Sequence, residues 1–230
     1  KNLLLSTLLN LSVSIAEVAG GLLSNSLALI SDALHNLGDT SALFIAYIAS
    51  HVSKKTSTPK KTFGYKRIEI LAALFNAIIL VAIVAYLFVE AIRRFNHPEP
   101  IKGLIMLIVA LVGFAANFIS IVLLKKHSSK NINIRAAYIH LLGDTVSSIL
   151  VIFSAFLIYY FNLFWIDPLV TLLLGIYLLK ETFQILKESV DILMQATPPG
   201  LDLSQLKAAL ESVPAIDNIH HVHVWNLNDQ

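Results

Sequence analysis

The sequence predicts an all-α membrane protein with six transmembrane helices, followed by a short polar tail that begins a further domain. Hydrophobic residues make up 56% of the 230 residues and charged residues only 14%, and the mean hydropathy is +0.72. A soluble domain of this length normally contains fewer apolar and more charged residues. A signal peptide would account for one apolar stretch near the start, but here such stretches recur along almost the whole chain. They are therefore predicted to span a lipid bilayer.

Six apolar segments are each long enough for the ~20 residues that a bilayer core requires. The predicted spans cover residues 3–23, 27–50, 69–93, 103–124, 134–160 and 168–187. Between the first two spans, the pair Gly20-Gly21 and the run Ser-Asn-Ser at 24–26 predict a tight turn, so these spans form a helical hairpin. We assign residues 1–196 to a transmembrane domain.

The tail changes character after Thr-Pro-Pro-Gly at residues 197–200. Residues 203–212 have the pattern of a short amphipathic helix, and residues 219–227 alternate like a strand. About 30 residues bury too little surface to fold alone, so residues 197–230 are expected to be the beginning of a cytoplasmic α+β domain. The chain also starts on Lys1 rather than methionine, and we expect both ends of the protein to continue beyond this sequence.

Basic residues indicate which side of the membrane each connection occupies. Those on one side follow the second and fourth spans: Lys54, Lys55, Lys60, Lys61, Lys66 and Arg67, then Lys125, Lys126, Lys130 and Arg135. The opposite side carries only Arg93, Arg94 and Lys102. Because cytoplasmic loops are enriched in Lys and Arg, this asymmetry predicts that both termini lie in the cytoplasm.

Charge and cysteine content exclude several classes of function. The formal net charge is only +2, and the basic residues lie in loops rather than on one helix face, so we expect no nucleic-acid partner. The sequence has no cysteine, which excludes a disulfide framework and a thiolate metal site. Any metal must therefore be held by His, Asp, Glu or backbone oxygen, and we expect no organic cofactor.

Two short motifs place ionisable residues inside predicted spans. His-Asn-Leu-Gly-Asp occupies residues 35–39, and His-Leu-Leu-Gly-Asp occupies residues 140–144. A separation of four residues puts His35 and Asp39 on one helix face, and His140 and Asp144 likewise. Two imidazoles and two carboxylates supply the number and kind of ligands that tetrahedral zinc prefers. A single shared site is favoured, because each aspartate alone in lipid would cost at least ~2.5 kcal/mol.

A plainer interpretation is that each His-Asp pair only forms a hydrogen bond within a polar bundle core. That alternative has about equal weight for one pair, but the identical spacing in two spans favours a metal site. Gly38 and Gly143 support it, since their lack of side chains lets neighbouring helices approach closely. His35 is near the outer end of its span and His140 near the cytoplasmic end, so a shared site requires tilted spans or a second span that projects into the cytosol.

Two further acids lie in the first two spans. Asp32 precedes His35 by three residues on the same helix face, and it either lines the outer access path or stabilises the start of the helix. Glu17, in the first span, either faces an aqueous passage or bonds across helices, and the structural role is favoured.

Other short patterns accompany the two His-x-x-x-Asp motifs along nearly the whole chain. They are Glu17 and Gly21, Ser-Leu-Ala-Leu at 26–29, Asp32-Ala33, Phe-Gly-Tyr at 63–65 with Arg67 and Glu69, Asp167-Pro168, and Leu193-Met194 ahead of a proline. In this combination the sequence resembles the cation diffusion facilitator family of metal transporters. It is most similar to zinc-type members, which carry His-x-x-x-Asp in the second and fifth spans.

The resemblance implies a homodimeric exporter of the bacterial inner membrane that moves zinc out of the cytosol in exchange for protons. It also implies a ferredoxin-like cytoplasmic domain after the sixth span. His35, Asp39, His140 and Asp144 would bind Zn²⁺ as the transported substrate. Cadmium and cobalt remain further candidate substrates, whereas harder cations such as manganese favour oxygen ligands.

The tail holds a second candidate metal site, since three histidines fall in the run His-His-Val-His at residues 220–223. Strand alternation would put His221 and His223 on one face and His220 on the other. The family commonly has His-Asp-Leu-His-Val-Trp here, so His220 and His223 match its histidines. Some relatives bind regulatory zinc in this region. The alternative is that these are surface histidines without a metal.

The metal chemistry also favours exchange over catalysis. Ligating imidazole must be neutral and carboxylate ionised, so protons compete directly with the metal, and alternating exposure of the site would turn that competition into antiport. A membrane-embedded metal hydrolase would need an open coordination position and a general base, neither of which the motifs indicate. We therefore expect no enzyme, while a metal sensor without flux remains an open alternative.

Overall fold

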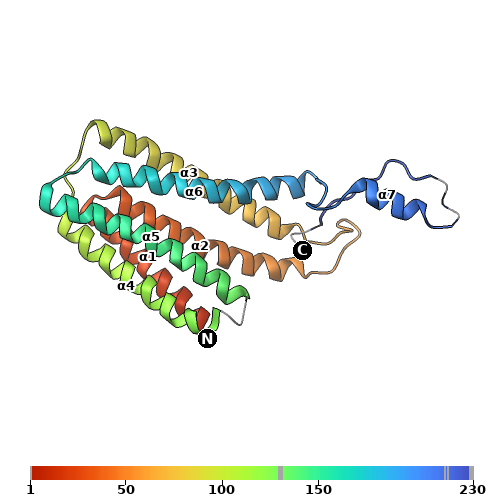
Figure 1. Cartoon of the computed structure of the whole chain (residues 1–230), viewed down its shortest axis with the longest axis horizontal. Coiled ribbons are helices and arrows are strands. Elements are labelled where there is room, and N and C mark those ends of the chain that lie inside the picture. Colours follow the sequence, from red (N-terminus) through yellow and green to blue (C-terminus); the bar gives the residue numbers. More distant parts are fainter. Residues whose placement is uncertain (1, 129–131, 215, 217, 228–230) are drawn as a thin grey trace. The chain divides into compact units, whose positions relative to one another are not determined.

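The structure is a computed structural model that describes residues 2–128, 132–214, 216 and 218–227 (Figure 1). Each of the six predicted spans lies within a separate long helix. The amphipathic segment of the tail forms a short helix. The helices in the described residues are α1 (Asn2–Ser24), α2 (Leu27–Ser53), α3 (Ile68–Asn96), α4 (Gly103–Ser128), α5 (Ile132–Phe161), α6 (Ile166–Leu193) and α7 (Leu203–Glu211). The all-α prediction is therefore confirmed at the level of secondary structure for the described residues.

Several of these helices are long and apolar enough to cross a membrane. In the described part of the chain four meet both conditions, Ile68–Asn96, Gly103–Lys125, Tyr138–Phe161 and Ile166–Leu193, and Leu9–Ser24 is a shorter apolar helix. The helix α2 is as long, but it carries Asp32, His35 and Asp39 in its first half, which lower its hydropathy. The helices are those of a multi-pass membrane protein.

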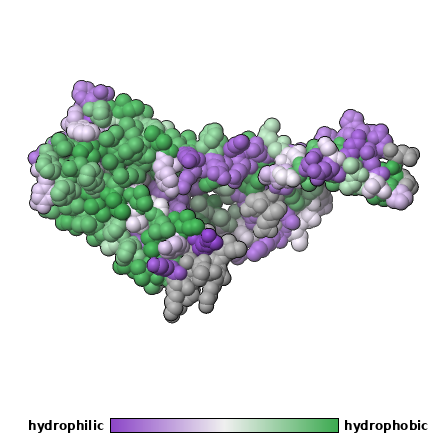
Figure 2. All heavy atoms as spheres, in the orientation of Figure 1, coloured by the Kyte–Doolittle hydropathy of each residue, from purple (hydrophilic) through white to green (hydrophobic). Residues whose placement is uncertain are grey.

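The chain divides into two compact units. Residues 1–44 and 78–182 form the first, and residues 45–77 and 183–230 form the second. The first unit is a helical bundle whose visible surface is covered largely by hydrophobic residues, whereas the segment around α7 is mostly hydrophilic (Figure 2). This contrast is the one expected between a lipid-facing bundle and a solvated tail.

The main core of the first unit joins α2, α4, α5 and α6. Three of its eleven buried residues are alanines, which allow the helices to approach closely at those positions. Its buried members are Ala28, Leu29, Ile101, Met106, Ala110, Val151, Ala155, Ile158, Ile166, Val170 and Leu174.

The carboxylate of Asp167 caps the start of α2. Asp167, at the start of α6, accepts hydrogen bonds from the hydroxyl of Ser26 (2.5 Å) and from the backbone N–H groups of Leu27 (2.7 Å) and Ala28 (3.2 Å). The first N–H groups of a helix have no partner within the helix, so a buried helix start needs such an acceptor. Asp167 is itself completely buried, and the contact fixes α6 to the hairpin of α1 and α2.

In the second unit, short-range contacts order the basic loop and α7. Lys61 pairs with Thr58 through an isolated bridge, and its ammonium group lies 4.3 Å from the centre of the Tyr65 ring. Asp202 caps α7 by accepting from the backbone N–H of Ser204 at 2.8 Å, and the backbone N–H groups of α7 lower the pKa of Asp202.

The strand predicted at residues 219–227 is wrong: the described residues of the tail contain no strand, and no β domain is present in them. His221 has a φ of 56°, in the left-handed region, which breaks the alternation of side chains. His221 and His223 therefore do not share a strand face. An extended segment needs a neighbour to pair its backbone groups, and the isolated bridge of Thr58 and Lys61 is the sole β pairing in the described part.

Candidate metal site

The two His-x-x-x-Asp motifs meet inside the first unit. The helix α2 supplies His35 and Asp39, and α5 supplies His140 and Asp144. From His35, Nδ1 lies 3.6 Å from Asp39 Oδ2 and Nε2 lies 3.4 Å from Asp144 Oδ1. From His140, Nε2 lies 3.2 Å from Asp39 Oδ2 and 3.5 Å from Asp144 Oδ2. The four side chains form a closed ring in which each histidine contacts both aspartates.

These separations agree with the size of a zinc shell. Zinc binds imidazole nitrogen and carboxylate oxygen at about 2.0 Å, so two ligand atoms of a tetrahedron lie ~3.3 Å apart. The four side chains are not arranged to bind one ion in this conformation, because His35 faces the two aspartates through different nitrogens. In the described residues no group of three or more such side chains is already set for a metal ion. Binding would require His35 to turn one nitrogen toward the common centre.

Several ring atoms lack hydrogen bonds. Among the described residues, Nε2 of His35, Oδ2 of Asp39 and Oδ2 of Asp144 are buried without a hydrogen-bond partner. A buried polar atom without a partner is costly, and facing carboxylates repel one another unless a cation lies between them. The geometry therefore favours a site that receives a cation.

The ring is buried on one side and open on the other. The side chains of His35 and Asp144 are 6% and 2% exposed, whereas those of His140 and Asp39 are 40% and 34% exposed. The exposed pair lies toward the start of α5 and the buried pair toward the hairpin turn between α1 and α2. An ion would therefore reach the ring from the end where α5 begins.

Asp32 lies on the buried side of the ring. It is 3% exposed and accepts hydrogen bonds from Ser147 (2.5 Å) and Ser148 (3.4 Å) of α5. Ser147 Oγ also lies 2.8 Å from the backbone carbonyl of Asp144. In this conformation Asp32 joins α2 to α5 behind the ring and does not line an open path.

The helices α1 and α4 support the ring from behind. The amide of Asn36 donates to Oε2 of Glu17 at 3.3 Å, which is the bond across helices predicted for Glu17. Asn117 of α4 lies 3.5 Å from the hydroxyl of Ser148 on α5. Asn36, which follows His35 in the sequence, is thereby bonded to α1, and α5 is bonded to α4 near the ring.

The two glycines of the motifs lie at close helix contacts, as predicted. A Cβ atom on Gly38 would lie 2.7 Å from Leu80 Cδ2, and one on Gly143 would lie 3.3 Å from the hydroxyl of Tyr177 on α6. The small residue before each aspartate therefore lets a third helix pack beside the ring.

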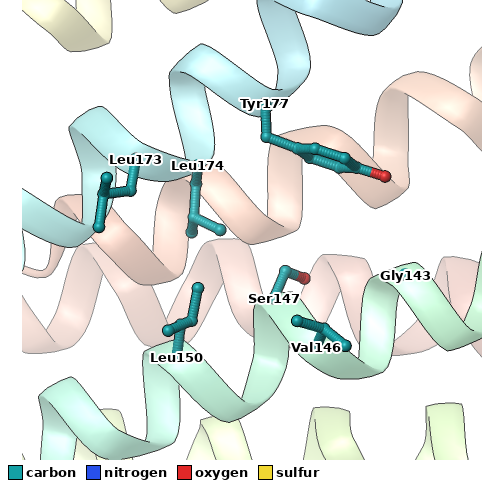
Figure 3. Close-up of a pocket in the computed structure, with 7 residues that line it drawn as sticks. All are labelled: Gly143, Val146, Ser147, Leu150, Leu173, Leu174 and Tyr177. Carbon is teal, nitrogen blue, oxygen red and sulfur yellow. The ribbon is translucent and has the colours of Figure 1, made fainter.

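Two residues of α6 near the ring were not predicted from the sequence. The aromatic side chain of Tyr177 packs edge-on to the imidazole of His35, with their centroids 6.1 Å apart. Tyr177 also lines a cavity of about 320 Å³ between α5 and α6, where its hydroxyl points along the α5 face near Gly143 (Figure 3). The carboxylate of Glu181 is close enough to interact electrostatically with His140. Their spacing of four residues on one face of α6 is the signal that could have indicated them.

The tail histidines lie in the second unit. His220, His221 and His223 are all exposed, and the rings of His220 and His221 are 5.1 Å apart at 83°. The described residues bring no third ligand to His220 and His223.

Comparison with known proteins identifies the family of this chain. Residues 3–194 match the family of the cation efflux transmembrane domain. The chain is 42% identical over 232 residues to a zinc transporter, ZitB, of Pectobacterium atrosepticum, covering all of this chain and 72% of that protein. It is 38% identical over 229 residues to a cadmium, cobalt and zinc/H⁺-K⁺ antiporter of Bacillus velezensis, covering 99% and 73%. It is also 38% identical over 213 residues to the metal cation efflux system protein CzcD of Cupriavidus metallidurans, covering 93% and 67%.

The family match spans the whole six-helix region that holds the ring of His35, Asp39, His140 and Asp144. Its members transport cations and are not enzymes, so a membrane-embedded hydrolase is excluded. The chain belongs to the cation efflux family.

Proposed function

We propose that this protein is a secondary transporter that exports zinc from the cytosol in exchange for protons, with cadmium and cobalt as further substrates. The observation that carries the proposal is the ring in which His35 and His140 each contact both Asp39 and Asp144, at 3.2 to 3.6 Å. Relatives of about 40% identity along the full chain are named as a zinc transporter and as an antiporter of cadmium, cobalt and zinc.

In the proposed site, one nitrogen of each histidine and one oxygen of each aspartate bind the ion. Four protein ligands satisfy tetrahedral zinc without an open position for catalysis. Zinc needs neutral imidazole and ionised carboxylate, so each ion that binds displaces protons from the ring. The histidines are the proposed proton carriers of this site.

Alternating exposure of the ring would drive the exchange. With both termini in the cytoplasm, the exposed side of the ring, at His140 and Asp39, would face the cytosol, as an inward-open state requires. Zinc would then displace protons on this side. After a rearrangement that opens the side of Asp32, protons from a more acidic exterior would displace the zinc. Asp32 would line the outer path in that second state.

The remaining assignments follow from the same sequence features. We propose that all six long helices span the membrane and that the basic connections face the cytoplasm of a bacterial inner membrane; Lys130 of the second connection lies outside the described residues. Residues 1–196 form the transmembrane domain, and residues 197–230 begin a cytoplasmic domain, in which His220 and His223 are either ligands of regulatory zinc or surface histidines without a metal. The working protein is a homodimer.

The decisive test is zinc flux into proteoliposomes with and without an imposed pH difference. The native protein should take up zinc, accelerated when the interior is acidic, and Asp144→Asn should abolish the uptake. Exposed Asp191 on α6 offers a matched control, Asp191→Asn, with native uptake. Zinc binding without uptake in the native protein would instead favour the metal sensor, and uptake that ignores the pH difference would refute proton exchange.

A further inference from the structure

Glu17 is a buried acid that the proposed zinc site does not use. Its side chain lies in the first unit on α1 and is 1% exposed. Oε2 accepts one hydrogen bond, from the amide of Asn36 at 3.3 Å. Oε1 is buried and has no hydrogen-bond partner among the described residues. The bond to Asn36 explains one oxygen of this carboxyl group and leaves the other unexplained.

The free oxygen points at the backbone of α4. A Cβ atom added to Gly113 would overlap Oε1 of Glu17, so only glycine leaves room for this oxygen. Val13, one turn earlier on α1, packs against the same place. The oxygen thus lies in a tight space between α1 and α4, where a side chain at position 113 would collide with it.

The charged neighbours of Glu17 are acids. They are Asp32 on α2 and Asp144 on α5, and on α4 the residue that faces it is Gly113. A buried carboxylate with one amide donor and two acidic neighbours is unfavourable in a medium of low dielectric constant unless a cation neutralises it. A hard divalent metal would need about six oxygen ligands, which Glu17 and Asn36 cannot supply.

We propose that Glu17 is a second proton-binding site, which loses its proton when the ring binds zinc. The inference rests on the proposed function and adds one proton carrier to it. Asn36 connects the two sites, because it bonds to Glu17 and is next to His35 in the sequence. Asp144 connects them electrostatically. Zinc at the ring neutralises Asp144 and brings positive charge near Glu17, which favours the ionised carboxylate.

The test is infrared difference spectroscopy of the purified protein in lipid, with zinc chloride as the probe. Zinc should remove the carbonyl band of a protonated carboxylic acid, and this loss should be absent in Glu17→Gln. The variant Glu69→Gln removes an acid of the second unit that bonds to Ser53, and it should keep the band. In weak buffer, Glu17→Gln should release fewer protons per bound zinc, by up to one per chain. An unchanged band and proton count in Glu17→Gln overturn the proposal.

A second measurement uses the native protein, so it does not require that a variant folds. In native protein made with glutamate labelled with ¹³C at its side-chain carboxyl, the zinc-sensitive band should shift, whereas labelled aspartate should leave it in place. A band that shifts only with labelled aspartate overturns the role of Glu17. The two proposals fail separately, because native zinc uptake with no glutamate signal refutes only Glu17, and absent uptake refutes the exporter.

Discussion

The Nε2 atom of His140 lies 3.2 Å from Oδ2 of Asp39, across the contact of α5 with α2. Neither residue belongs to the other's motif, so this contact joins the two motifs into one ring. The same two residues are its exposed members, and access and binding therefore coincide at this pair.

Removing one charge from the ring should weaken zinc binding strongly. Asp144→Asn keeps the shape of the side chain but replaces a carboxylate that contacts both histidines. We expect a zinc dissociation constant at least about tenfold higher, equivalent to 1.4 kcal/mol, measured by calorimetry in detergent. Asp191→Asn is the control, and equal affinities in the two variants would contradict the site.

Tyr177 should support His35 through its aromatic group rather than through its hydroxyl. Edge-on aromatic contacts contribute about 0.5–1.5 kcal/mol, which corresponds to a change of roughly two- to tenfold in affinity. Tyr177→Ala should therefore raise the dissociation constant for zinc within that range, while Tyr177→Phe should stay within about twofold of native. The same titration measures both, and equal losses would show that the hydroxyl matters instead.

Asp167 should contribute to stability and not to zinc affinity. It is buried and accepts three hydrogen bonds at the start of α2, so Asp167→Ala leaves two backbone N–H groups without their acceptor. Each lost partner costs about 1–3 kcal/mol. We therefore expect a clear fall in the thermal midpoint, measured by circular dichroism. Ser26→Ala removes the hydroxyl that donates to Asp167 and accepts from the backbone N–H of Leu29, so it leaves one backbone N–H group without an acceptor and should cost less. A native midpoint in Asp167→Ala would show that the cap is dispensable.

Glu99 should stabilise the loop between α3 and α4 in a pH-dependent way. The hydrogen bond from Asn25, followed by the charges of Arg94 and Arg93, lowers the pKa of Glu99. A carboxyl group with a lowered pKa stabilises the fold above its ordinary pKa, about 4.3, and the stabilisation is lost as the pH falls through the lower folded value. The thermal midpoint of Glu99→Gln should therefore be below native at pH 7.

The difference between native protein and Glu99→Gln should shrink in acid, below the ordinary pKa of the group. The effect is small, because the carboxyl group is partly exposed and therefore screened by solvent. A difference that stays constant across this range would show that the amide, rather than the missing charge, causes it.

Much of the fold and of the ring could be predicted from the sequence, because both depend on local periodicity. Apolar length located the six helices to within a few residues, and the spacing of four placed each histidine with its aspartate. The residues around the ring were less accessible. Tyr177 and Glu181 look like ordinary residues in the middle of α6 until α6 packs beside α2 and α5.

The tail shows where local pattern fails. Residues 219–227 alternate as a strand does, yet a strand exists only with a partner, and the left-handed backbone of His221 interrupts the run. Alternation describes one segment, whereas pairing depends on a second.

The sequence by itself determined that two pairs of ionisable residues lie in helices long enough for a membrane, since helix periodicity and hydropathy act over neighbouring residues. Only the tertiary structure decided that the pairs face each other and that, among the described residues, one oxygen of Glu17 beside Gly113 has no hydrogen-bond partner. Which helices pack together depends on the sum of many contacts between distant segments, and no stretch of sequence contains that sum.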